Sequence, residues 1–218
     1  MRTLWHRFLA PLTPGVRFLL VVLTAMALAT FLGDFSHAYD LSQWLALSGP
    51  DFWTGMIWPI LTYALLPATL FDFLFNWLVL LFLGSLLERV WSRTQFWTFC
   101  LVATLGAGLA KVLAQPSTPS LLVGTTPMVF GLLVAWGWLF GHEKVLFFFI
   151  WEMTARQAAV AMILIAFLTM LPCAGLVNSA IMLCGGLAGW IYLWLQSKLL
   201  GARRSQTTTS ERMGRLEL

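Results

Sequence analysis

The sequence predicts an all-α membrane protein with six membrane-spanning helices. Only 10% of its 218 residues are charged and 60% are hydrophobic, whereas soluble domains average about 25% charged residues. A chain so poor in charge cannot cover its own surface in water, so its outer surface must face lipid. The apolar residues gather in runs separated by polar or proline-containing breaks, and six spans of about 20 residues with their connections fill this length.

Six apolar runs are expected to cross the membrane. The first comes after a basic lead-in and resembles a signal peptide, but the segment beyond it is itself membrane-like, so a retained helix is expected. The connection at 33–66 is rich in Trp and lacks Lys and Arg, which suits a segment in the membrane interface. The connection at 141–157 carries an apolar piece, 145–151, that is too short to span. The expected spans are 18–32, 69–87, 96–113, 126–140, 158–171 and 177–195.

The basic residues give the expected orientation. With the N-terminus in the cytoplasm, every Lys and Arg of the 13 except Lys111 falls on the cytoplasmic side, as the positive-inside rule requires. The expected domains are a cytoplasmic segment at 1–17, a membrane domain at 18–199 and a disordered cytoplasmic tail at 200–218. We expect an integral protein of a bacterial inner membrane with both termini cytoplasmic.

The remaining composition excludes several classes of function. The net charge of +4 comes from basic residues at the chain ends and in short connections, so it indicates topology and not nucleic-acid binding. The three cysteines are odd in number, lack a CxxC spacing and lie in or beside apolar runs. They are interpreted as buried small hydrophobic residues, and no metal site and no cofactor are expected.

Polar side chains within the spans are candidates for function because they are costly in lipid. Asp72 and Asn76 stand at i and i+4, so they share one face of the second span. The stretch 124–127, Gly-Thr-Thr-Pro, opens the fourth span from the same outer side, and Asn178 and Ser179 lie near the start of the sixth. These polar groups are expected to meet in the outer half of the bundle.

Glycines in the fourth and sixth spans are expected to let helix backbones approach closely. The sixth span carries the spacing Gly185-x-x-x-Gly189, and Gly124 and Gly131 offer the same freedom to the fourth. Packing is the simpler interpretation of these positions.

Each polar candidate also has a purely structural interpretation. Thr126 before Pro127 suits a helix N-cap followed by proline at the first helical position. Asp72 could accept a hydrogen bond from Thr126 or from a backbone N–H, and Asn76 could bond to another helix. Glu88, with the arginine after it, is interpreted as a solvated helix end.

Three stretches of the chain resemble the rhomboid superfamily of intramembrane serine proteases. Residues 58–91, WPILTYALLPATLFDFLFNWLVLLFLGSLLERVW, are similar to the end of that family's first loop and its second helix. Residues 123–133, VGTTPMVFGLL, are similar to the start of its fourth helix, and 178–189, NSAIMLCGGLAG, to its sixth. The stretches come in the family's order, so the resemblance implies a six-helix rhomboid-like bundle.

The catalytic positions of that family are changed here. The nucleophilic serine corresponds to Thr126, and the glycine beside it to Pro127. The histidine of the sixth helix corresponds to Met182 if the glycines set the alignment, or to Ile181 if Asn178 does. Met182 is preferred, and neither residue is a base; packing in the core is the simpler role for the methionine.

The oxyanion-binding positions are changed in part. The second-helix histidine corresponds to Asp72, and the arginine after Trp58 is Pro59. The resemblance retains five positions, namely Asn76, Gly124, Glu88, Gly185 and Gly189. The scaffold positions are kept where the catalytic ones are lost.

Elementary chemistry agrees with the loss of catalysis. A hydroxyl nucleophile needs an adjacent base, and the three histidines, His6, His37 and His142, all lie outside the expected spans. An ionised Asp72 would accept hydrogen bonds and repel an oxyanion.

The leading hypothesis is therefore a non-catalytic, rhomboid-like pseudoprotease that binds transmembrane helices of client proteins within membrane lipid. The resemblance implies docking between the second and fifth helices. One alternative is an intramembrane peptidase using Thr126 with Asp72 or a water as base. Another is a small transporter with Asp72 as a proton or cation site, although no inverted repeat is visible.

Overall fold

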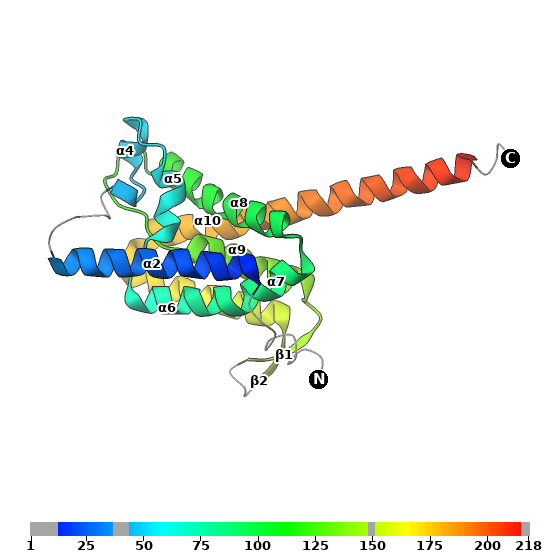
Figure 1. Ribbon diagram of the computed structural model, residues 1–218, viewed down its shortest axis with the longest axis horizontal. Helices are drawn as coiled ribbons and strands as arrows, with labels where there is room; N and C mark the ends of the chain where they lie inside the picture. Colours follow the sequence, from blue (N-terminus) through cyan, green and yellow to red (C-terminus); the bar gives the residue numbers. More distant parts are fainter. Residues whose placement is uncertain (1–12, 37–43, 148–150, 215–218) are drawn as a thin grey trace.

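The computed structural model describes residues 13–36, 44–147 and 151–214. Its long helices run roughly parallel and antiparallel around one central helix, α9, and most short elements lie at the two ends of this bundle (Figure 1). The chain is predominantly helical, as the sequence predicts. The core of buried apolar side chains lies between α9 and the helices around it.

Among the described residues, five helical segments are long and apolar enough to cross a membrane. Helix α2 covers Pro14–Ser36 and α8 covers Arg93–Ala114. Helix α6 (Leu70–Val79) continues through a π-helical turn, η2 (Leu80–Gly84), into α7 (Ser85–Val90). Helix α10 (Ala155–Gly214) contains two helices joined at Gly175, whose φ is 76°. The five candidate spans are Pro14–Leu32, Leu70–Val90, Arg93–Ala114, Ala155–Pro172 and Gly175–Lys198.

The expected fourth span is a shorter helix, α9, which covers Thr126–Leu139 with 14 residues. At 1.5 Å per residue it is about 21 Å long, compared with about 30 Å for a bilayer's hydrocarbon core. Its side chains are buried on nearly every face, from Thr126 to Leu133 without interruption. A helix that is apolar all round belongs in the middle of a protein, and α8 and α10 pack against this one.

The connection after α2 forms short helices at one end of the bundle. These are α4 (Gly49–Trp53), α5 (Pro59–Thr62) and the 3₁₀ turn η1 (Tyr63–Leu65). Proline stands in the first turn of both α4 and α5, where its missing N–H costs nothing. The Tyr63 hydroxyl donates to the carbonyl of Thr104 on α8 at 2.7 Å. This bond fixes the connection to the bundle.

The connection after α9 contains a β-hairpin that the sequence analysis did not predict. Strands β1 (Lys144–Phe147) and β2 (Trp151–Thr154) pair antiparallel, with Lys144 opposite Thr154. The apolar piece interpreted only as too short to span therefore contributes to a sheet. Aromatic and β-branched residues favour strands, and this composition was the available signal.

Both chain ends are more helical than predicted. Helix α2 begins at Pro14, before the first expected span, and α10 continues to Gly214, through most of the tail that was predicted to be disordered. Extending an existing helix avoids the cost of nucleation, which explains how a polar tail continues the sixth span as helix. In Figure 1 this part of α10 projects beyond the bundle.

Glu88 differs most clearly from its sequence interpretation as a solvated helix end. Its side chain is only 8% exposed. Its carboxylate accepts hydrogen bonds from the Thr13 hydroxyl and from the backbone N–H groups of Gly15 at 2.9 Å and Val16 at 2.8 Å. Glu88 therefore caps the N-terminus of α2 from another helix, which explains why α2 starts so early.

Candidate polar site between α6 and α9

The first two turns of α6 and the first turn of α9 bring three polar side chains together. The Thr126 hydroxyl donates to Oδ1 of Asp72 at 2.8 Å. The amide nitrogen of Asn76 donates to the same Asp72 oxygen and to the Thr126 hydroxyl oxygen, each at 3.0 Å. We call Asp72, Asn76 and Thr126 the polar triad. The two helices are thus joined by a closed set of hydrogen bonds inside an apolar bundle.

Local sequence explains why α6 starts where it does. The Thr69 hydroxyl accepts a hydrogen bond from the Asp72 backbone N–H at 3.1 Å, so Thr69 is the N-cap of α6. Asp72 then stands in the first turn, where a carboxylate suits the helix dipole. Asn76 comes one turn later on the same face.

The start of α9 is fixed by Gly124 and Thr125. Gly124 has a φ of 114°, which a residue with a side chain rarely adopts, and its N–H donates to the Tyr63 carbonyl at 3.1 Å. Thr125, not Thr126, is the N-cap residue, and its hydroxyl donates to the Ala64 carbonyl at 2.8 Å instead of capping the helix. The N-cap role expected for Thr126 is therefore wrong, and its hydroxyl is free to join the polar triad.

Two members of the polar triad are almost completely enclosed. Thr126 and Asn76 are each 2% exposed, and Asp72 is half-buried. Within the described part of the chain, Oδ2 of Asp72 and Oδ1 of Asn76 are buried without a hydrogen-bond partner. A Cβ atom at Gly124 would make an ordinary contact of 3.5 Å with Oδ2 of Asp72, so the positive φ of this residue, and not lack of space, favours glycine.

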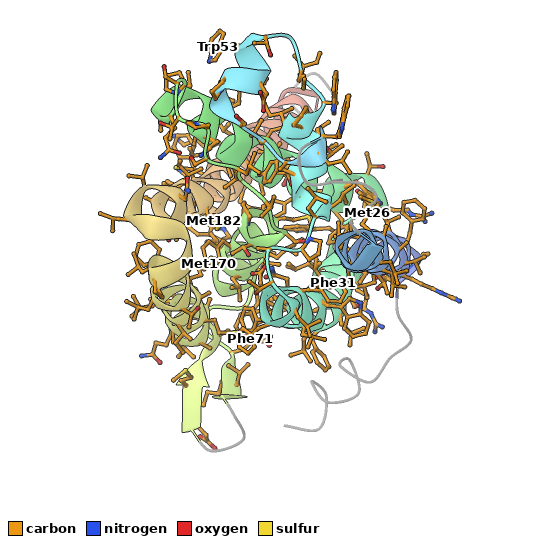
Figure 2. All side chains as sticks on the ribbon, turned by 90° about the vertical axis from the view of Figure 1, so that its left-hand side faces the viewer. Met26, Phe31, Trp53, Phe71, Met170 and Met182 are labelled. Atoms are coloured by element: carbon orange, nitrogen blue, oxygen red, sulfur yellow. The ribbon has the colours of Figure 1, made fainter. Side chains whose placement is uncertain are left out.

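Helix α10 meets the start of α9 through a glycine, one turn after Met182. Met182 is 4% exposed and Ile181 is 3% exposed, so both positions that the resemblance gives to the histidine hold core residues. Figure 2 shows Met182 on the inner side of α10. A Cβ atom at Gly185 would lie 2.6 Å from the Pro127 carbonyl oxygen, which means that the two backbones are in direct contact there.

Glycines 189 and 131 lie at the same packed interface. A Cβ atom at Gly189 would come within 2.8 Å of the Phe99 ring and within 3.3 Å of Gly131 itself. At Gly131 it would approach Ala103 of α8 to 2.9 Å. Small residues here permit three helices to pack closely.

The sixth span does not supply a polar side chain to the triad. The Ser179 hydroxyl donates to the Gly175 carbonyl at 2.8 Å, and the Asn178 side chain accepts from Lys111 at 3.1 Å. The expectation that polar groups from three spans meet is therefore wrong for this span. Asn178 and Ser179 lie about one turn closer to the kink at Gly175 than Met182 does, and their side chains bond to Lys111 and to the Gly175 carbonyl.

Lys111 forms a second polar cluster that sequence reasoning missed. It is completely buried at the end of α8, and its ammonium group donates to Gln115, to the Ser120 hydroxyl at 2.6 Å and to Asn178. All three acceptors are neutral oxygens. The available signal was the position of Lys111, which alone departs from the positive-inside pattern.

The polar triad offers a hydroxyl beside a carboxylate, but the surroundings are poor for acyl transfer. A carboxylate at 2.8 Å can accept a hydroxyl proton. Met182 has no proton-accepting nitrogen, and the one histidine in the described part of the chain, His142, is exposed beyond the end of α9. The site therefore has a short polar network but no imidazole.

The apolar spans define an integral membrane protein. The chain matches the family described as eukaryotic integral membrane protein (DUF1751) over residues 17–207, and it belongs to that family. No curated protein matches the chain. The description as eukaryotic fits poorly with the bacterial inner membrane expected from the sequence. Proteins of many kinds of membrane have apolar spans and flanking basic residues, so these features did not identify the organism.

Proposed function

We propose that this protein is a non-catalytic, rhomboid-like membrane protein that binds transmembrane segments of other proteins. The observation that carries the proposal is the polar triad. The Thr126 hydroxyl is buried and bonded to Asp72 and Asn76, and the position that the resemblance gives to the base is Met182, a buried thioether. This arrangement stabilises a helix contact and leaves the hydroxyl closed to a substrate.

The rhomboid-like arrangement is supported by the contacts of the three resembling stretches. The second span meets the start of α9 through the polar triad, and α10 meets it through Gly185. We propose that α9 is the fourth of six crossings. Because it is enclosed by other helices, its short length need not match the lipid thickness. The basic residues Arg89, Arg93 and Lys144 support a cytoplasmic location for the end of the bundle where they lie.

The outer faces of α6 and of Ala155–Pro172 are the proposed client surface. Only 17% of the Ala155–Pro172 segment is buried, compared with 50% of Arg93–Ala114. On α6, Phe71 is 73% and Leu74 is 55% exposed, and Figure 2 places Phe71 at the edge of the bundle. Half-buried Asp72 adds a polar group beside this apolar face, and polar groups with close packing drive helix association in lipid.

A cross-linking experiment tests client binding. The protein carries a photoreactive amino acid at Phe71 or Leu168 and is reconstituted in liposomes with a synthetic single-span Leu/Ala helix. Leu28 of α2, which is 57% exposed, provides a matched control, since Leu168 is 54% exposed. Binding at the proposed surface predicts cross-links from positions 71 and 168 in excess of position 28. Equal yields at all three positions would show contact by random collision and refute the proposal.

A second candidate is favoured by one specific distance. The 2.8 Å bond from Thr126 to Asp72 would let the carboxylate act as base for a threonine nucleophile. A cleavage assay on a helical membrane substrate distinguishes the candidates. The non-catalytic proposal predicts no cleavage by the wild type, whereas cleavage abolished by both Thr126→Ala and Asp72→Asn would establish the peptidase.

A further inference from the structure

A pocket lies among the short helices at the end of the bundle that also holds the starts of α6 and α9. It has a volume of about 340 Å³, and its described lining residues are Trp44, Asp51, Met56 and Leu121. Volumes of about 300–1,000 Å³ are typical of small-molecule sites. This pocket is separate from the polar triad, and the client-binding proposal does not use it.

The walls of the pocket are held by hydrogen bonds from neighbouring segments. The indole N–H of Trp58 donates to the Trp44 carbonyl at 3.0 Å, and the Met56 N–H donates to the Asp51 carbonyl at 3.1 Å. Leu47 and Leu122 exchange a pair of backbone bonds at 3.0 and 2.8 Å, which places Leu121 beside this loop. The pocket is therefore built on a fixed backbone.

The chemistry of the lining is that of a site for a soft cation. Trp44 is 66% exposed and offers an indole ring, Met56 offers a polarisable thioether, and Asp51 supplies one carboxylate. Within the described part of the chain, the Asp51 side chain has no hydrogen-bond or ion-pair partner. Tryptophan attracts cations most strongly among the aromatic residues, and quaternary ammonium groups are the cations that such sites recognise.

The charges around the pocket agree with a cationic ligand. Residues 33–66 contain no Lys or Arg. Lys111, the basic residue at the end of α8, directs its ammonium group to Gln115, Ser120 and Asn178. Among the described lining residues, Asp51 is thus an unpaired negative charge.

We propose that this pocket binds the choline headgroup of a phosphatidylcholine molecule from the surrounding membrane. Exposed tryptophans such as Trp44, Trp53 and Trp58 are typical of segments at headgroup level. A lipid headgroup is therefore present at high local concentration where the pocket opens. The trimethylammonium group would lie against the indole and thioether, with Asp51 as counter-charge.

Native mass spectrometry of the full-length protein tests the proposal. The protein is mixed with equal amounts of phosphatidylcholine, phosphatidylethanolamine and phosphatidylglycerol with identical acyl chains. We expect phosphatidylcholine to be retained about threefold to tenfold over the other two, as a cation–aromatic contact with a counter-charge predicts. Asp51→Asn and Trp44→Leu should each remove this preference. Trp53→Leu is the matched control, because Trp53 is 64% exposed on the same loop but does not line the pocket.

Three other results would overturn the proposal. The wild type could retain phosphatidylcholine and phosphatidylethanolamine equally, and Asp51→Asn could lose both. This result would show a site that recognises positive charge alone and not the trimethylammonium group. A preference for phosphatidylcholine that survives Asp51→Asn and Trp44→Leu would place the lipid elsewhere. Water-soluble phosphocholine at millimolar concentration should fail to displace the lipid; displacement would identify a soluble ligand instead. Unchanged thermal stability of each variant shows that the fold is intact.

Discussion

Replacing Glu88 with alanine should separate the N-terminus of α2 from the second span. The carboxylate accepts three hydrogen bonds, from the Thr13 hydroxyl and from the backbone N–H groups of Gly15 and Val16. A hydrogen bond contributes about 1 kcal/mol to stability, and one to a charged group about 1.5–3 kcal/mol. Because water can replace part of the loss at the end of a bundle, we expect Glu88→Ala to lower the free energy of unfolding by about 3 kcal/mol.

The assay is reversible unfolding in mixed micelles with increasing dodecyl sulfate, monitored by circular dichroism. Glu88→Gln keeps an acceptor oxygen but loses the charge, so it should lower the free energy of unfolding by about half as much. Glu152→Gln is the matched control, because that side chain is exposed on β2. If Glu88→Ala unfolds at the same dodecyl sulfate concentration as the control, the capping contact does not hold α2 in place.

Three further predictions concern packing and buried polar groups. Gly185→Ala should lower the melting temperature markedly, because its Cβ would lie 2.6 Å from the Pro127 carbonyl oxygen, whereas Gly186→Ala, with 3.5 Å to its nearest neighbour, should be nearly neutral. Equal melting temperatures would contradict the close contact of α9 and α10. Lys111→Met should destabilise the protein by about 1–3 kcal/mol in the same unfolding assay, since three half-buried oxygens lose this charged donor; a neutral effect would mean that the lysine adds nothing. Burial raises the pKa of Tyr63 above its value in the unfolded chain. As the pH rises, the phenol therefore loses its proton first in the unfolded chain, and the stability that the buried, protonated phenol contributes is present below about pH 10 and lost above it. The decline in stability at alkaline pH should therefore be shallower in Tyr63→Phe than in the wild type, and identical pH profiles would refute this.

The sequence predicted the helical class and the approximate spans because both arise from long apolar runs. It also predicted that Asp72 and Thr126 could bond, because the i, i+4 pattern and the start of the fourth span place them at one end of the bundle. These are consequences of local spacing and helix geometry. The resemblance to rhomboids located the same positions but does not by itself give them a function.

Other contacts between distant segments could not be predicted. Glu88 was interpreted as solvated, since no local pattern shows that residues 13–16 return to meet it. The Lys111 cluster likewise joins α8 to the kinked start of the sixth span, and the hairpin at 144–154 depends on pairing of two short runs. Each of these depends on tertiary structure that one sequence does not encode in its local pattern.

The π-helical turn Leu80–Gly84 has a consequence for the second span as a whole. In a regular α-helix each residue advances by about 100°, so Glu88, twelve positions after Asn76, would point about 120° away from it. A wide turn accommodates one additional residue, and this brings the angle down to about 20°. The π-helical turn thus places Asn76 and Glu88 on one face of the span. Asn76 bonds to α9 from this face, and Glu88 bonds to α2. A regular α-helix with the same number of residues would turn one of the two anchors about 120° away from its partner, whereas removing one residue from the turn would keep the two in phase.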